Sequence, residues 1–140
     1  MARIRISLPD QFRFSVQIPI RITDLNYGRH VGNDSILSLL HEARVQFLAA
    51  SGFTEMDFAG TSLIMGDVAI EFKAELFYGD ALTAYVEAAE FSRVGFELFY
   101  KLTKGEGTLV AVAKTGMICF DYTNRKVAAV PEKARQALSA

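Results

Sequence analysis

Apolar and polar residues alternate along the first part of the chain, which is the period of a β-strand with one buried face. The alternation begins at Phe12 and continues to Ile22. Proline has no amide hydrogen, so we expect the part of the strand around Pro19 to lie at a sheet edge or a bulge. Residues 23–33 contain two glycines, two asparagines and an aspartate. This composition predicts a long polar loop after the strand.

A helix is predicted over about residues 34–51, where apolar residues recur at three- and four-residue intervals. Asn33 or Asp34 is the expected N-cap, and Gly52 supplies a stop. The apolar stripe consists of Ile36, Leu39, Leu40, Ala43 and Phe47. A separate polar face carries Ser35, Ser38, Glu42 and Gln46.

Four further strands are predicted at about 62–76, 81–91, 96–103 and 108–122, with glycine-containing turns between them. A short helix over 131–138 ends the pattern. The expected fold class is therefore α+β: an antiparallel sheet of about five strands wrapped around one long helix, with a short C-terminal helix. The last strand is apolar on both faces, which predicts that a second subunit covers it.

Length and composition limit the possible classes of protein. A chain of 140 residues is the size of one domain, so residues 1–140 are expected to form a single unit. The net charge is −1 and no block of like charges occurs, which makes nucleic acid an unexpected partner. Cys119 is the only cysteine and no metal-ligand spacing is present, so we expect no metal, no cofactor and a reducing cytoplasm. No apolar run is long enough to cross a membrane.

The loop and the helix together carry a motif. Asp24, the pair His30 and Val31, Asn33, and the helix segment 42–44 (Glu-Ala-Arg) stand in the order and spacing of a known signature. In these residues the chain resembles the hot-dog-fold thioesterases of the 4-hydroxybenzoyl-CoA thioesterase group and the related acyl-ACP thioesterases. The resemblance implies a hot-dog fold, a homodimer or homotetramer, and hydrolysis of an acyl thioester of CoA or of acyl carrier protein. Two alternatives stay open: a hot-dog protein that binds acyl thioesters without catalysis, and a hot-dog enoyl-thioester hydratase.

The chain departs from the family pattern at the position that matters for catalysis. The family's second aspartate falls on Asn26, and Arg29 replaces the usual glycine. An amide has no basic site, so the base must be Asp24, His30 or Glu42, with Asn26 holding water or the thioester by hydrogen bonds.

The start of the helix is the predicted source of polarisation. Its free backbone N–H groups near Asn33 and Asp34 are expected to polarise the thioester carbonyl. Glu42 lies about 12 Å further along the helix, so it is expected to serve a site only across a subunit interface. Asp24 is our predicted base, although it could equally be a structural acid that accepts the backbone N–H groups of its own loop.

Overall fold

The computed structural model describes residues 3–139 and leaves Met1, Ala2 and Ala140 outside the described part. The elements follow in the order β1 (Phe14–Pro19), the 3₁₀-helix η1 (Ile22–Asp24), α1 (Asn33–Ala50), β2 (Ser62–Phe72), β3 (Ala81–Ala89), β4 (Gly95–Lys104), β5 (Thr108–Asp121), β6 (Lys126–Val127) and α2 (Glu132–Ser139). All the strands belong to one sheet in which the order is β1-β3-β4-β5-β2, with β6 paired to β5. Each of these pairings is antiparallel.

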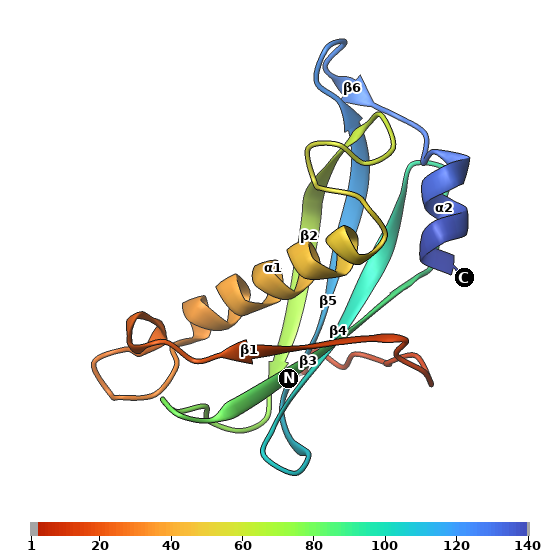
Figure 1. Cartoon of the computed structure of the whole chain (residues 1–140). Helices are drawn as coiled ribbons and strands as arrows, with labels where there is room; N and C mark the ends of the chain where they lie inside the picture. The colour runs from red at the N-terminus through yellow and green to blue at the C-terminus, as the bar shows by residue number, and fades with distance from the viewer. Residues whose placement is uncertain (1–2, 140) are drawn as a thin grey trace.

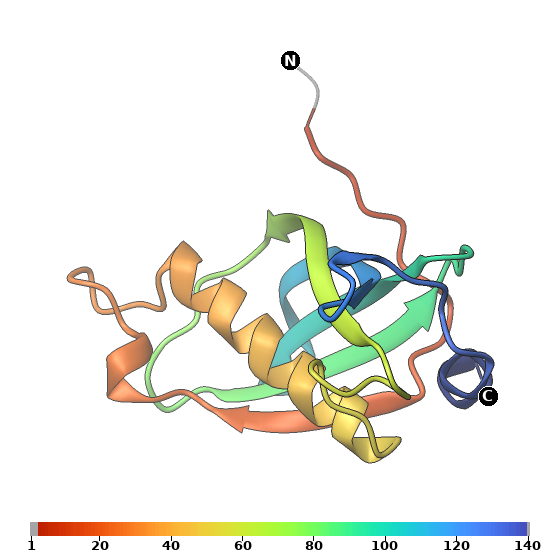
Figure 2. The same cartoon turned by 90° about the horizontal axis from the view of Figure 1, so that it is seen from above.

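The sheet curls around α1, which crosses its concave face (Figures 1 and 2). Helical spacing places Ile36, Leu40, Ala43 and Phe47 on the side of α1 that is buried in the hydrophobic core. This architecture confirms the α+β fold predicted from the sequence. The helix begins and ends one residue earlier than expected.

A charged residue also lies on the buried side of α1. Arg44 is buried, and its guanidinium donates to the carboxylate of Glu55 (3.2 Å) and to the hydroxyl of Tyr100 (3.2 Å). That hydroxyl is 2.8 Å from the hydroxyl of Thr115 on β5. This network joins α1 to the centre of the sheet and satisfies the buried charge, which would otherwise be costly.

The N-terminal segment covers part of the outer face of the sheet. The amide of Ile6 donates to Glu71 on β2 (2.7 Å), and the ring of Phe12 packs edge-on against Tyr85 on β3. Phe99 and Val112 are correspondingly buried, although they lie outside the core around α1. The chain therefore covers part of this face itself, and that a second subunit covers the rest of β5 stays a prediction.

The strands differ from the expected ones in two respects, and the first affects the site. β2 ends at Phe72 instead of Leu76, so residues 73–76 leave the ladder. The strand β6 was not predicted; it pairs only two residues with the end of β5. Neither of the α-helices in residues 3–139 combines the length and the apolar character needed to cross a membrane.

Candidate active site

The loop between η1 and α1 folds into a small hairpin. The carbonyl of Asn26 accepts the amide of Arg29 (3.0 Å), and the amide of Asn26 donates to the carbonyl of His30 (2.8 Å). The side-chain oxygen of Asn26 accepts the amide of Gly28 (2.8 Å), which is the arrangement of an Asx turn. Leu25 and Val31 form the bridge that closes the hairpin.

Backbone bonds attach this hairpin to the segment that follows β2. The amide of Val31 donates to the carbonyl of Leu76 (2.7 Å), and the backbones of His30 and Phe77 form an isolated antiparallel β-bridge. These bonds bring His30 beside Glu75, a residue 45 positions later in the chain. The early end of β2 therefore has a consequence for the site, because it frees residues 73–76 to meet the loop.

The start of α1 differs from the expected cap. Gly32 is the N-cap, and no side chain caps the helix, whereas the sequence pattern favoured Asn33 or Asp34 in that role. The first helical bond runs from the amide of Ile36 to the carbonyl of Gly32 (3.1 Å). Within residues 3–139, the amides of residues 33–35 have no hydrogen-bond acceptor. They are therefore available to an oxygen that carries partial negative charge.

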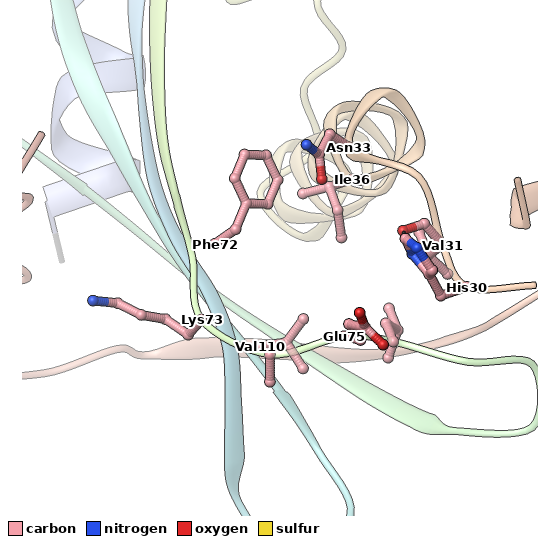
Figure 3. Close-up of a pocket in the computed structure, with 10 residues that line it drawn as sticks. His30, Val31, Asn33, Ile36, Phe72, Lys73, Glu75 and Val110 are labelled. Atoms are coloured by element: carbon pink, nitrogen blue, oxygen red, sulfur yellow. The ribbon is translucent and has the colours of Figure 1, made fainter. Parts of the chain in front are cut away.

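A pocket of about 270 Å³ lies between the helix start, the hairpin and the end of β2 (Figure 3). Buried Val31, Ile36, Leu76 and Val110 form its apolar lining, and Phe72 stands beside them. Figure 3 shows Asn33 and Ile36 on one side of the space, with the carboxylate of Glu75 on the opposite side. The full lining is His30, Val31, Asn33, Ile36, Phe72, Lys73, Ala74, Glu75, Leu76 and Val110.

The hydrogen bonding of His30 indicates which of its ring nitrogens carries the hydrogen. Its Nδ1 lies 3.1 Å from the carbonyl oxygen of Val31. Because a carbonyl oxygen only accepts, Nδ1 carries the hydrogen in the neutral ring and Nε2 is left without one. Nε2 of His30 can therefore accept a hydrogen bond.

The structure brings three of the predicted site residues together. Asn26, His30 and the helix start lie around the same two glycines: a Cβ on Gly28 would lie 3.2 Å from the Asn26 side-chain oxygen and 3.4 Å from the His30 ring. A Cβ on Gly32 would lie 3.7 Å from the Asn26 side-chain nitrogen. Asn26 therefore lies between the histidine and the helix start.

Asp24 and Glu42 lie elsewhere. The carboxylate of Asp24 is buried, accepts the amide of Arg21 (2.8 Å) and pairs with the guanidinium of that residue (3.1 Å), which raises the pKa of Arg21. Asp24 does not line the pocket, and its role as the base stays a prediction. Glu42 is exposed, accepts a hydrogen bond from Gln46 (2.8 Å) and borders a separate groove between β1 and α1.

Glu75 is the residue that the sequence pattern missed. Its carboxylate faces the pocket, and within residues 3–139 it accepts no hydrogen bond and forms no ion pair. The apolar alternation continues through Ile70, Phe72 and Leu76, so nothing in the local pattern marks the end of the strand or singles out this glutamate. No group of three or more His, Cys, Asp or Glu side chains with metal-binding geometry occurs in the described part of the chain.

An antiparallel sheet wrapped around one long helix, with a pocket at the uncapped start of that helix, defines a hot-dog domain equipped to act on an acyl group. The chain belongs to the thioesterase-like superfamily, whose family model matches residues 20–138. This membership confirms the resemblance stated from the motif, and with it the expectation of a thioester hydrolase.

A named relative agrees with this assignment, and solved structures share the fold. The chain is 33% identical over 106 residues to a 1,4-dihydroxy-2-naphthoyl-CoA hydrolase from Microcystis aeruginosa, a match that covers 74% of this chain and 76% of the relative. The fold is similar to that of a 1,4-dihydroxy-2-naphthoyl-CoA thioesterase from Synechocystis, with a TM-score of 0.82, 22% identity, and coverage of 90% of this chain and 95% of the other. A Staphylococcus aureus protein in complex with CoA has the same fold, with a TM-score of 0.82, 18% identity, and coverage of 96% and 86%.

Proposed function

We propose that this protein hydrolyses the CoA thioester of a compact, aromatic acyl group. The observation that carries the proposal is the pocket between the free amides of α1 and the carboxylate of Glu75. At about 270 Å³ the pocket is slightly smaller than the usual range for ligand sites, about 300–1,000 Å³. Its apolar walls and the ring of Phe72 suit a flat acyl group, and two relatives are named for a naphthoyl-CoA substrate.

In the proposed reaction the thioester carbonyl oxygen lies at the start of α1. The amides of residues 33–35 stabilise the negative charge that develops on this oxygen, a contribution of about 10²–10³ in rate for each donor. Asn26 holds the thioester or the attacking water by hydrogen bonds, as the sequence suggested.

Glu75 supplies the base that Asn26 cannot provide. Its carboxylate takes a proton from water as the water oxygen bonds to the carbonyl carbon. The tetrahedral intermediate then collapses, the C–S bond breaks, and the thiolate takes up a proton by way of Glu75 or of Nε2 of His30. Asp24 remains the alternative base, and Glu42 could contribute only to a site formed with another subunit.

The test is a panel of thioesters with release of free thiol as the readout. We expect the purified protein to hydrolyse 1,4-dihydroxy-2-naphthoyl-CoA or benzoyl-CoA with kcat/KM about tenfold or more above that for palmitoyl-CoA. Assays of the same acyl groups attached to acyl carrier protein would show whether the protein uses CoA thioesters or acyl carrier protein thioesters. Absence of thiol release from every member would refute hydrolysis and favour a non-catalytic acyl-thioester-binding protein. Hydration of an enoyl-CoA without thiol release would favour the hydratase.

We further propose a homodimer, or a homotetramer built from such dimers. Within residues 3–139, β2 pairs only with β5, so its other edge carries unpaired backbone groups. Met65, Val68 and Phe72 on this strand are exposed, and a long apolar edge strand invites pairing with another chain. Pairing there would give the pocket a second wall beside Phe72. Light scattering should give at least twice the subunit mass of 15.5 kDa, and a monomeric mass at micromolar concentration would contradict the proposal.

We place this activity in the cytoplasm. The single cysteine, Cys119, is buried in β5, and burial raises the pKa of its thiol. A chain with one neutral, buried thiol forms no internal disulfide and suits a reducing compartment.

A further inference from the structure

The turn beside the pocket holds an arginine in an unusual backbone conformation. Arg29 has a φ of 68°, in the left-handed region that residues with a Cβ disfavour. Glycine adopts that conformation without strain, whereas a residue with a Cβ does not. In Figures 1 and 2 the loop that carries this turn stands away from the sheet beside the start of α1. A strained residue next to a functional site suggests that its side chain has a use.

The charge of Arg29 is not neutralised by the described residues. None of the ion pairs formed by residues 3–139 includes Arg29, and its side chain is exposed. Two other cations lie close to the pocket but are paired: Lys73 with Glu71 (3.3 Å) and Lys104 with Asp80 (3.5 Å). The guanidinium of Arg29 therefore forms no ion pair with the described residues and can bind an anion. In the sequence, Arg29 directly precedes His30.

A fully exposed aromatic ring stands in the same turn. Tyr27 has a relative exposure of 103%, so its phenol ring contacts no other part of the chain. A single exposed aromatic carries little weight by itself. In the same turn as the unpaired guanidinium of Arg29, however, it completes the pair of groups that recognise a nucleotide: a planar donor for phosphate and a flat ring for a base.

We propose that Arg29 and Tyr27 form a subsite for the phosphorylated nucleotide end of a CoA thioester. The inference rests on the proposed function, because it requires the acyl group to occupy the pocket and the thioester to lie at the start of α1. The pantetheine arm then leaves through the mouth of the pocket, past the hairpin. Phosphate oxygens accept hydrogen bonds from the guanidinium of Arg29, and adenine stacks on Tyr27.

The test compares one acyl group on two carriers: CoA, and pantetheine, which has the same thiol arm without phosphate or adenine. In Arg29→Gly we expect KM for the CoA thioester to rise about tenfold, with KM for the pantetheine thioester and kcat for both unchanged. The difference should shrink at high salt, since an exposed charge pair is screened. Tyr27→Ala should change the same ratio by about fivefold or more.

A matched control exists in the chain. Arg125 has a φ of 54° in the turn between β5 and β6, away from the pocket lining. Relief of left-handed strain should raise Tm by about 3 °C in both Arg29→Gly and Arg125→Gly. Of these two glycine variants, only Arg29→Gly should change the ratio of the two KM values. Arg29→Lys should restore part of the affinity, because lysine keeps the charge and loses the bidentate geometry.

Two results would overturn the subsite, and they differ from failure of the proposed function. An unchanged KM ratio in Arg29→Gly, with the wild type active on both thioesters, would exclude Arg29 from nucleotide binding. A drop of Arg29→Gly to a lower oligomer mass with the ratio unchanged would assign the side chain to a subunit contact instead. If the wild type hydrolyses neither thioester, the proposed function fails; calorimetric binding of CoA itself that weakens in Arg29→Gly would then still support the subsite.

Discussion

Replacing Glu75 with glutamine tests the assignment of the base most directly. Glutamine keeps the shape of the side chain and removes the site that accepts a proton. We expect kcat to fall by about 10²–10⁴-fold, the range for loss of a general base. KM should change little, because the carboxylate acts on the attacking water and the thioester is held by the apolar walls and the amides of α1.

The structure also fixes what the substitution should leave intact. Glu75 is exposed, and its side chain has no hydrogen bond or ion pair within residues 3–139, so its replacement removes no stabilising contact. Surface changes of this kind alter the free energy of unfolding by at most about 0.5 kcal/mol. The melting temperature should therefore stay within a degree or two of the wild type. Loss of turnover without loss of stability would then report chemistry alone.

The assay is release of CoA thiol at saturating substrate, which reports kcat. Glu42→Gln is the control, since it makes the same chemical change on an exposed glutamate outside the pocket. Full turnover in Glu75→Gln would refute our placement of the base, and loss of turnover in Glu42→Gln would indicate a site shared between subunits.

Three further substitutions probe other parts of the arrangement. Asp24→Asn should lower the free energy of unfolding by about 1 kcal/mol, because the carboxylate holds the amide and guanidinium of Arg21. An equilibrium denaturation curve measures this change. A loss of turnover of about 10²-fold at unchanged stability would instead identify Asp24 as the base. Gly32→Ser adds a hydroxyl at the N-cap that accepts a hydrogen bond from a helix amide and so makes that amide unavailable to the substrate. Turnover should fall about 10²-fold while Tm does not drop. Unchanged turnover would argue against these amides as the oxyanion site. Burial raises the pKa of Tyr100, so above pH 10 the unfolded chain loses this proton and the folded chain keeps it. Stability should therefore decline as pH rises from 10 towards the raised pKa, and Tyr100→Phe should show a shallower decline in denaturation midpoints over that range.

The sequence was sufficient for the elements whose patterns are local. The stripe from Ile36 to Phe47 predicted α1 to within one residue at each end, because one face of that helix is buried against the sheet along its whole length. The long strands were predicted from alternation and from the glycines between them. The motif also pointed to Asn26 and His30, which lie near the helix start, and their roles stay a prediction.

What the sequence could not provide was set by contacts between distant segments. The end of β2 depends on the bond from Val31 to Leu76, which no local pattern encodes. Glu75 consequently looked like one more polar residue on a strand. The N-cap was also misplaced: Gly32 has no side-chain oxygen, so the usual signal pointed to the next polar residue, Asn33. The packing of Phe12 and the residues before it on the outer face of the sheet could not be predicted either, because it depends on which face the rest of the fold leaves uncovered.

The neutral residue at position 26 becomes understandable once the position of Glu75 is known. The turn needs an acceptor from Asn26 for the amide of Gly28, and an amide oxygen meets that need as well as a carboxylate would. A negative charge at position 26 would lie next to the helix start, where Asp34 already places one carboxylate 2.6 Å from the position of a Cβ on Gly32. A second anion there would oppose the charge that the helix amides must stabilise. Glu75 lies across the pocket from Asn33 (Figure 3). In the proposed mechanism, the base and the helix amides therefore act from opposite sides of the thioester.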